Sequence, residues 1–458
     1  MRVRNAFGSL LSVMLLLLAA SSGLARGRQP KWPAEAAGAT GRPAAQAPWF
    51  NVEVDMPHNT GQHVSVAIDP STGVTYVSYY DATHGDLRMA HYVGSGGNCG
   101  PSGSWHCQTV DSDGDVGQYS SIAVWEGKIK IAYHDATHGS LKYALASYGP
   151  TGSWWIQNVD KETPPINTGL YASLGLAYNG SSYISYYSDD PTGVDALRIA
   201  DFVGSGGNCG YGTTAGMWRC ETVDTGEGVG QHTSLAVVGS YAYRHIAYYD
   251  RGNGDLWYAT NHGGTNCGPG GNTWTCYPVT GSTADVGQYA SLYMDDEDHF
   301  HIAYYDATAD TLKYAVDVGG GGNCGVLGSA QCDEIDAMMQ GYNPLGVSVA
   351  EDAAGYPIIA YQSQYGSLNV ARPLAAVGLP AGGGNCGPEN LFYTWYCETI
   401  DRYGMWTPYR NGDYVSIAVG PSGLSTIAYY RVFTTSSDGN LMVSQQRLQA
   451  FLPLVMKT

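Results

Sequence analysis

Apolar and polar residues alternate along most of this chain in short runs separated by turn residues, which is the pattern of β-strands. One stretch shows four such runs in succession, with turns at Glu126-Gly127 and Asp135 to Gly139; the runs are Gly117 to Val124, Lys128 to His134, Leu141 to Ala146 and Trp154 to Asp160. Helical periodicity appears nowhere between Trp49 and Gln446. The pattern predicts an all-β unit of four strands.

The first strand of this unit recurs along the chain. It contains a serine that returns seven times, at spacings of 52 to 68 residues, as Ser65, Ser121, Ser173, Ser234, Ser291, Ser348 and Ser416. Self-similarity at a fixed period is the signature of repeat architectures, which grow by adding units and can remain one domain at 458 residues. We therefore expect seven units in a single domain.

A tryptophan strand ending in Val-Asp or Ile-Asp also recurs. Five copies are complete and two, Trp274 to Thr280 and Ala330 to Asp336, are altered; the complete ones are Trp49 to Asp55, Trp105 to Asp111, Trp154 to Asp160, Trp218 to Asp224 and Trp395 to Asp401. The first copy precedes the first unit, and the last unit lacks one. The count balances if the chain closes into a ring. We predict a seven-bladed β-propeller of four-stranded antiparallel blades over residues 49–446, closed by the N-terminal strand.

The ends of the chain differ from the repeats in composition. Residues 1–25 are predicted to be a signal peptide, with Arg2 and Arg4 before an apolar run from Met14 to Ala20 that is too short to span a bilayer. Residues 26–48 are rich in Ala, Gly, Pro and Arg and are predicted to be a flexible linker, and residues 447–458 form a C-terminal apolar tail. We expect a secreted or cell-surface protein without an integral membrane segment after signal cleavage.

The ten cysteines form five local pairs, each opened by Asn-Cys-Gly: Cys99 with Cys107, Cys209 with Cys220, Cys267 with Cys276, Cys324 with Cys332, and Cys386 with Cys397. No Cys-x-x-Cys spacing typical of zinc or redox sites occurs. Because exported proteins meet an oxidising environment, we expect five disulfides.

Charge and motifs narrow the classes of partner. Six of the 22 basic residues and one of the 40 acidic residues precede Trp49, which leaves 16 basic and 39 acidic groups, a formal charge of −23. Such a field repels nucleic acids and anionic membranes. The sequence has no phosphate-binding loop or Gly-x-Ser-x-Gly elbow, and we expect no cofactor and no metal. Asp111 to Asp115 alternates carboxylates as a calcium loop does but lacks the distal glutamate.

Propeller topology sorts the recurring polar residues by face. A Gly-Gln-(Tyr or His) motif precedes the first strand of a blade and an Asp ends the second, so both belong on the face that carries the 4-to-1 and 2-to-3 connections, opposite the cysteine loops. The candidate ligand-binding residues on this face are Gln62, His63 and Asp81; Gln118, Tyr119 and Asp135; Tyr171 and Asp189; Gln231, His232 and Asp250; and Gln288, Tyr289 and Asp306. Blade six departs with Gly346 and Ser363, and blade seven with Asp413 and Arg431.

Two interpretations of these residues stay open. An Asp before Ala-Thr-x-Gly is suited to closing a turn, and the aromatic residue beside it can serve packing between blades. Alternatively, the set contacts a ligand. The two roles can coexist.

The repeats Gly-Gln-(Tyr or His)-x-Ser-(Ile or Leu)-Ala, Ile-Ala-Tyr-Tyr-Asp and Gly-Asp-Leu-Lys-Tyr-Ala resemble those of secreted bacterial β-propeller proteins, a loose group with lectin-like and sialidase-like members. The resemblance covers about residues 49–446 and implies the fold. The sialidase Asp-box, Ser-x-Asp-x-Gly-x-Thr-Trp, is absent, so the resemblance implies no sialidase chemistry.

Repetition of one residue set favours binding over catalysis, because acid-base chemistry needs a pair of groups with different environments. The sequence predicts multivalent recognition of carbohydrate, or of another extracellular ligand such as a cell-surface polymer, at one face of the ring. Two alternatives remain. One is a cell-surface scaffold or adhesion protein without a small ligand, and the other is a propeller-type extracellular glycoside hydrolase or lyase.

Overall fold

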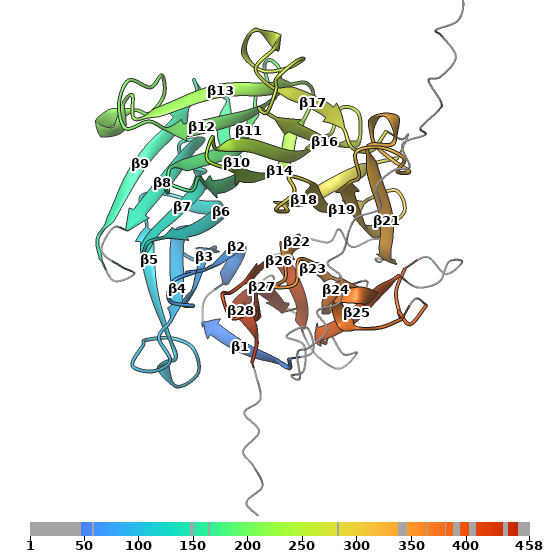
Figure 1. Ribbon diagram of the computed structural model, residues 1–458. Coiled ribbons are helices and arrows are strands. Elements are labelled where there is room, and N and C mark those ends of the chain that lie inside the picture. The colour runs from blue at the N-terminus through green and yellow to red at the C-terminus, as the bar shows by residue number, and fades with distance from the viewer. Residues whose placement is uncertain are drawn as a thin grey trace, which may run out of the picture.

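Seven four-stranded antiparallel sheets surround a central axis in the computed structural model, which confirms the predicted β-propeller (Figure 1). The structure describes residues 47–447 except 57–58, 147–148, 150–151, 164, 282–283, 338–345, 364, 381, 388–393, 403–408 and 434–437. Helical structure in these residues is limited to five 3-10 turns. The predicted signal peptide, most of the predicted linker and nearly all of the apolar tail lie outside the described residues.

Each blade runs from an innermost strand beside the axis to an outermost strand at the rim. Blades one to three contain β2 (Thr60–Ile68), β3 (Thr75–Asp81), β4 (Asp86–Tyr92) and β5 (Trp105–Asp111); β6 (Val116–Trp125), β7 (Lys128–Asp135), β8 (Ser140–Ala146) and β9 (Trp154–Lys161); and β10 (Asn167–Leu176), β11 (Ser182–Asp189), β12 (Ala196–Phe202) and β13 (Trp218–Thr225). Blades four and five contain β14 (Val229–Val238), β15 (Tyr243–Asp250), β16 (Asp255–Thr260) and β17 (Thr275–Pro278); and β18 (Val286–Met294), β19 (Phe300–Asp306), β20 (Thr311–Asp317) and β21 (Ala330–Ala337). Blades six and seven contain β22 (Val347–Glu351), β23 (Pro357–Gln362), β24 (Leu368–Pro373) and β25 (Trp395–Asp401); and β26 (Tyr409–Val419), β27 (Ser425–Phe433), β28 (Gly439–Gln446) and β1 (Trp49–Asp55). The four runs predicted for blade two match its strands to within one residue at each end.

The ring is closed by the N-terminal strand, as predicted. Strand β1 pairs antiparallel with β28, so that Trp49 lies opposite Gln446 and Val52 opposite Val443. The outermost strand of blade seven therefore comes from the opposite end of the chain to its other three. The pairing covers the edge of β28, which would otherwise be open to pairing with another chain.

A ring of hydrogen bonds joins the innermost strands. In every blade the hydroxyl of the recurring serine accepts a hydrogen bond from a backbone N–H of the next blade, at 3.0 to 3.2 Å; the acceptor and donor pairs are Ser65 and Ile122, Ser121 and Leu174, Ser173 and Leu235, Ser234 and Leu292, Ser291 and Val349, Ser348 and Ile417, and Ser416 and Val66. The serine recurs because each blade needs this contact to hold its neighbour.

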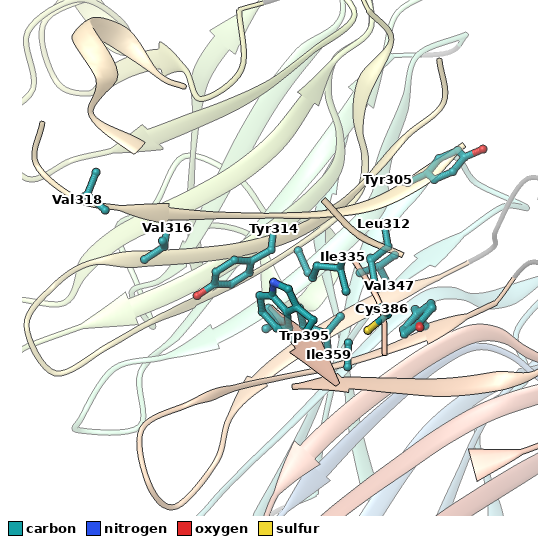
Figure 2. Close-up of a cluster of buried hydrophobic side chains, with 14 residues drawn as sticks. Tyr305, Leu312, Tyr314, Val316, Val318, Ile335, Val347, Ile359, Cys386 and Trp395 are labelled. Carbon is teal, nitrogen blue, oxygen red and sulfur yellow. The ribbon is translucent and has the colours of Figure 1, made fainter. Parts of the chain in front are cut away.

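The hydrophobic core lies between neighbouring blades rather than within one. Figure 2 shows the cluster between blades five and six, where Tyr314 of β20 faces Trp395 of β25 with ring centroids 5.3 Å apart in an edge-on arrangement. Tyr143 of blade two contacts Trp218 of blade three in the same way, at 5.1 Å. Where it is present, the recurring tryptophan thus packs its rim strand against the preceding blade, where large buried aromatic rings contribute most to packing.

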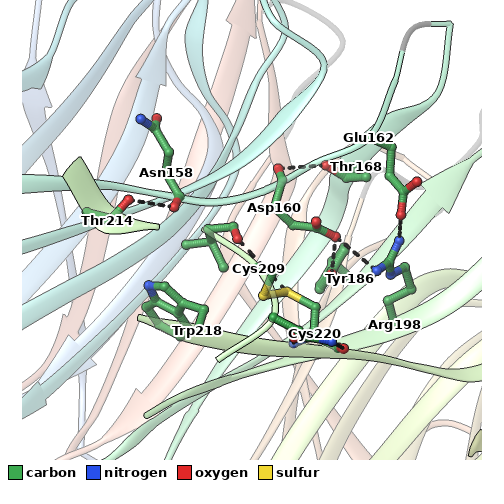
Figure 3. Close-up of a disulfide and its surroundings, with 12 residues drawn as sticks. Asn158, Asp160, Glu162, Thr168, Tyr186, Arg198, Cys209, Thr214, Trp218 and Cys220 are labelled. Carbon is green, nitrogen blue, oxygen red and sulfur yellow. Dashed lines mark hydrogen bonds and ion pairs between the residues drawn. A yellow bond between two sulfur atoms is a disulfide. The ribbon is translucent and has the colours of Figure 1, made fainter. Parts of the chain in front are cut away.

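The aspartate that ends the tryptophan strand binds the following blade. Its carboxylate accepts a hydrogen bond of 2.5 to 2.6 Å from a tyrosine near the end of the second strand, in the pairs Asp55 and Tyr79, Asp111 and Tyr133, Asp160 and Tyr186, Asp224 and Tyr248, Asp336 and Tyr361, and Asp401 and Tyr429. Figure 3 shows the Asp160 example, in which Arg198 approaches the same carboxylate at 3.4 Å. The contact between blades four and five differs, because Thr280 stands in blade four where the other blades have the aspartate.

All five predicted disulfides are present. In each loop the asparagine of Asn-Cys-Gly closes the turn with two hydrogen bonds to the second cysteine; Asn98, for example, donates to the carbonyl of Cys107 at 2.9 Å and accepts from its N–H at 2.7 Å. The asparagine side chain thereby makes the donor and acceptor contacts that the backbone of a neighbouring strand would make.

Five disulfides indicate an oxidising compartment. Among the described residues, no helix is long and apolar enough to cross a membrane.

Candidate functional site

A β-bulge shapes the start of the innermost strand in six of the seven blades. The pairing register shifts on both sides of the glutamine position in blades one to five and at Asp413 in blade seven. The next residue is then aromatic with φ between +50° and +55°, as in His63, Tyr119, Tyr171, His232, Tyr289 and Tyr414. A residue with a Cβ in this left-handed region costs about 1–2 kcal/mol. The same backbone conformation therefore sets the direction of one aromatic side chain in each of six blades.

The six aromatic side chains form a ring around the channel. Neighbouring centroids are 4.4 to 4.7 Å apart, from Tyr414 through His63, Tyr119, Tyr171 and His232 to Tyr289. They line a cavity of about 210 Å³ on the axis, together with Gly346, Val347 and the residues that follow each ring. We call these six side chains and this cavity the aromatic ring and the axial cavity.

The aromatic ring is uncharged at neutral pH. Burial lowers the pKa of His63 to about 3, an effect to which His134 adds, and burial alone lowers the pKa of His232 to about 3. Burial raises the pKa of Tyr289 and of Tyr414 to about 12, and both the Tyr119 hydroxyl and Asp413 contribute to the rise. Neutral or hydroxyl-bearing groups suit such a cavity better than anions.

Four of the candidate aspartates do not line the axial cavity and close the 2-to-3 turns instead. Asp81, Asp135, Asp250 and Asp306 are at most 4% exposed. Each accepts backbone hydrogen bonds from its own turn; Asp81, for example, accepts from the N–H of Thr83 at 3.0 Å and of His84 at 3.2 Å, and the other three do likewise. Their observed contacts are those of the turn-closing interpretation.

Asp189 of blade three is more accessible than the other four. Burial, Asp195 and Asp190 raise its pKa. Blade three also has Leu170 at the glutamine position, so its candidate residues are Tyr171 and Asp189. In blade seven Asp413 is held by Arg410 at 2.6 Å and Arg431 by Asp401 at 2.7 Å, so both departures have internal partners.

The glutamines join a network between blades that the sequence did not predict. In blade five the Nε2 of Gln288 donates to both oxygens of Asp285 at 3.2 Å, and Tyr249 of blade four donates to the same carboxylate at 2.5 Å. In blade two Asp115 accepts from Tyr80 of blade one at 2.7 Å and from Gln118 at 3.5 Å. The signal was the Asp-Val-Gly-Gln sequence at both positions, with the aspartate three residues before the glutamine.

The other two glutamines have weaker versions of this network. Gln62 lies 3.4 Å from the hydroxyl of Tyr430 in blade seven and 3.5 Å from Asn59, which takes the place of the aspartate. Gln231 lies 3.5 Å from the hydroxyl of Tyr187 in blade three. The glutamines therefore connect neighbouring blades beside the aromatic residues, and their contact with a ligand stays a prediction.

A larger pocket opens on this face between blades four and five. Its volume is about 530 Å³, and it is lined by Gln231, His232, Tyr249, Arg251, Gly252, Asn253, Gly254, Ala284, Asp285 and Gln288. We call it the blade 4/5 pocket. His232 belongs to both the pocket and the aromatic ring, so the two sites adjoin.

The 2-to-3 turn of blade four, which lines this pocket, differs from the same turn in blades one, two and five. Blades one, two and five have a threonine after Asp-Ala, and its hydroxyl accepts from a backbone N–H of the preceding loop, at 2.9 Å from Thr83 to Asn59 and at 2.7 Å in the other two. Blade four has Arg251 and Gly252 at these two positions. The turn therefore presents a guanidinium and, beside it, a residue without a side chain. Sequence reasoning missed Arg251 and Asn253 because it followed what the blades share.

The carboxylates of Asp111 to Asp115, the possible calcium loop, have separate partners. Asp111 accepts from Tyr133 and contacts Lys142 at 2.6 Å, whereas Asp115 belongs to the glutamine network. Within the described residues, no group of three or more candidate metal ligands converges.

No known protein family and no curated protein matches the sequence. Among solved structures, the chain is similar to a Dyadobacter fermentans protein of unknown function (11% identity, 87% of this chain and 98% of that chain, TM-score 0.42). It is also similar to the SapL1 lectin in complex with alpha methyl fucoside (15%, 70% and 94%, TM-score 0.39) and to the Hadza microbial sialidase Hz136 (13%, 67% and 64%, TM-score 0.42). These likenesses are too distant to carry an argument about function.

Proposed function

We propose that this protein is an exported binding protein that recognises a neutral, hydroxyl-rich ligand, a carbohydrate, at the face carrying the glutamines and the aromatic ring. The blade 4/5 pocket carries this proposal. Its size of about 530 Å³ falls in the range of small-molecule sites, which is about 300–1,000 Å³.

The polar groups of the pocket suit sugar hydroxyls. Gln231 and Gln288 each line the pocket with a side-chain amide whose carbonyl oxygen can accept from a sugar hydroxyl, while the Nε2 of Gln288 is held by Asp285. Arg251 adds donors at the mouth. Asn253 is fixed by its contact of 2.7 Å with the buried Asp250, so that its position is set before a ligand arrives. His232 contributes a neutral ring at the inner wall. Groups held in advance reduce the entropy that binding costs.

The lining favours binding over glycoside hydrolysis. A glycosidase of the usual kind needs two carboxyl groups on either side of the scissile bond. Asp285 is the one acidic residue among those that line the pocket, and it already accepts hydrogen bonds from Tyr249 and Gln288. It is suited to holding those two side chains in place.

The blades differ in their 2-to-3 turns, which changes the number of binding sites expected per chain. Multivalent binding was expected from the repeated set, but Arg251 and Gly252 distinguish blade four from blades one, two and five. We therefore propose one principal site at the blade 4/5 pocket, with any further sites weaker.

A glycan array with the purified mature chain tests this function, followed by calorimetric titration of the best ligand. We expect selective binding with about one site per chain. Absence of binding to any carbohydrate would contradict the proposal and favour a scaffold or adhesion role.

A further inference from the structure

The three side-chain amides that line the blade 4/5 pocket are oriented by the protein. Each donates from its amide nitrogen to a neighbouring side chain; the donor and acceptor pairs are Gln288 and Asp285 at 3.2 Å, Asn253 and Asp250 at 2.7 Å, and Gln231 and Tyr187 at 3.5 Å. In the part of the chain that the structure describes, no donor bonds to the carbonyl oxygens of these amides. An amide held by its nitrogen presents its oxygen, which is an acceptor. The pocket therefore offers three carbonyl acceptors to a ligand.

The carboxylate of Asp285 adds a charged acceptor beside these carbonyls. One oxygen accepts from the hydroxyl of Tyr249 at 2.5 Å, and both accept from the Nε2 of Gln288. A carboxylate has about four lone-pair sites, so these contacts leave it able to accept from one more donor. Hydrogen bonds to an ionised group are roughly twice as strong as neutral ones, and a positive charge on the donor adds attraction.

The positive charge of the pocket lies on its other side. A Cβ built on Gly228 would lie 2.5 Å from the Cβ of Arg251 and 3.1 Å from its Cδ, so the stem of Arg251 runs along the loop that enters blade four. That loop is bonded to blade three, because the N–H of Gly228 donates to Asp195 at 2.8 Å. Asp285 instead lies in the loop that enters blade five, and His232 adds no charge because burial lowers its pKa to about 3. The blade-five side of the pocket is therefore acidic.

A basic group with several hydrogens matches this side of the pocket better than other sugar substituents. A hydroxyl donates one hydrogen, whereas an ammonium donates three and has no lone pair. A uronate would place its carboxylate oxygens against acceptors, and an N-acetyl group would remove the charge and all but one N–H. The excess of acidic over basic residues in the chain also attracts cations.

We propose that the blade 4/5 pocket is specific for amino sugars, with the amino group between Asp285 and the carbonyl oxygens of Gln231 and Gln288. This inference rests on the carbohydrate function proposed above and deepens it by naming the class of sugar. An amino sugar is hydroxyl-rich and, as the free base, neutral. It takes up a proton near neutral pH, and the carboxylate stabilises the protonated form.

A glycan array tests this specificity when it presents glucosamine, galactosamine and mannosamine beside their N-acetyl and hydroxyl counterparts, together with glucuronate and galacturonate. The intact mature chain should bind at least one of the amino sugars. Titration calorimetry should then give that sugar roughly tenfold or more affinity over both of its counterparts. At about pH 9, where such an amino group is largely deprotonated, the preference should disappear.

Two aspartate variants locate the amino group. Asp285→Asn removes the charge but keeps an oxygen that accepts from Tyr249, so it should remove the preference for the amine and retain binding of the hydroxyl counterpart. Asp115→Asn makes the same change in blade two, where Tyr80 donates to the carboxylate at 2.7 Å and Gln118 at 3.5 Å, and it should leave the preference unchanged. Thermal melts establish that both variants are folded. The titration at high pH tests the inference without any variant.

The outcomes separate this inference from the carbohydrate function. The inference would be overturned, and the carbohydrate function would stand, if sugars bind without preference for the amine or if uronates bind best. A preference that persists at about pH 9, or equal effects of the two aspartate variants, would overturn it as well. Absence of binding to every sugar on the array would contradict both.

Discussion

The hydroxyl of Ser416 accepts a hydrogen bond from the backbone N–H of Val66 at 3.1 Å, across 350 positions of sequence. It is the same contact that joins every other pair of adjacent blades. Together with the pairing of β1 and β28, it makes the junction between the two ends of the chain equivalent to the six others.

Removal of the closing strand should therefore destabilise the whole ring. We expect that deletion of residues 26–55 lowers the melting temperature and the cooperativity of unfolding, whereas deletion of residues 26–46 leaves both unchanged. Calorimetry measures both quantities. Equal melting of the two truncations would contradict closure by β1.

The hydrogen bonds between the recurring serines and the next blade predict an equal loss of unfolding free energy at different junctions between blades. Ser416→Ala leaves the N–H of Val66 without its acceptor, and Ser121→Ala does the same to Leu174. Each should reduce the free energy of unfolding by about 1–3 kcal/mol, as expected for a buried donor that loses its partner. Chemical denaturation measures the loss. A cost confined to Ser121→Ala would show that the junction between the chain ends contributes little.

The tyrosine–aspartate contacts between blades predict that loss of a tyrosine hydroxyl costs more stability where an aspartate accepts from it than where none does. Tyr133→Phe deprives the buried carboxylate of Asp111 of a 2.6 Å hydrogen bond and should cost about 1–3 kcal/mol of unfolding free energy. Tyr304→Phe makes the same change in blade five, where Thr280 replaces the aspartate, and should cost less. A similar loss in both variants would mean that the hydroxyl rather than its carboxylate partner determines the effect.

The ring histidines predict a pH dependence of stability. In the folded chain the pKa of His63 and of His232 is about 3, whereas the unfolded value is near 6.5. The unfolded state therefore binds more protons between these values, so stability is fully present above about pH 6.5 and is lost as the pH falls. Between pH 6.5 and pH 5, where carboxylates remain ionised, the free energy of unfolding should fall by up to about 2 kcal/mol per histidine.

The variant with His63→Phe and His232→Phe provides the control for this slope. It should flatten the dependence of unfolding free energy on pH over the same interval, although other buried histidines keep part of it. An unchanged slope would indicate that the two ring histidines titrate normally in the folded protein.

Sequence patterns predicted the parts of this fold that repeat locally. The alternation of apolar residues located the strands, the surplus tryptophan strand at Trp49 predicted the closure, and the Asn-Cys-Gly spacing predicted the disulfides. Each of these features depends on neighbours in the same strand or loop, or on a count along the chain.

The candidate site was predicted less completely, because its contacts cross between blades. The position of Gln288 beside Asp306 at the end of neighbouring strands suggested one cluster. The bulge instead directs Tyr289 into the channel, while Asp306 is buried under its turn and Gln288 bonds to Asp285. The departure of Gly346 from the repeat is visible in the sequence, but only the structure shows that Gly346 lines the axial cavity together with the six aromatic side chains.

Recognition at the blade 4/5 pocket is the central claim, and paired glutamine variants test it most directly. Gln288→Leu alters a residue that lines the pocket, and Gln118→Leu alters the same repeat position in blade two, where the glutamine also faces an aspartate. The decisive measurement is calorimetric titration of both variants, after a melt confirms folding, with the carbohydrate selected on the array. We predict that Gln288→Leu weakens binding at least tenfold and that Gln118→Leu retains the affinity and stoichiometry of the unmodified chain; equal affinity of the two variants would contradict the account.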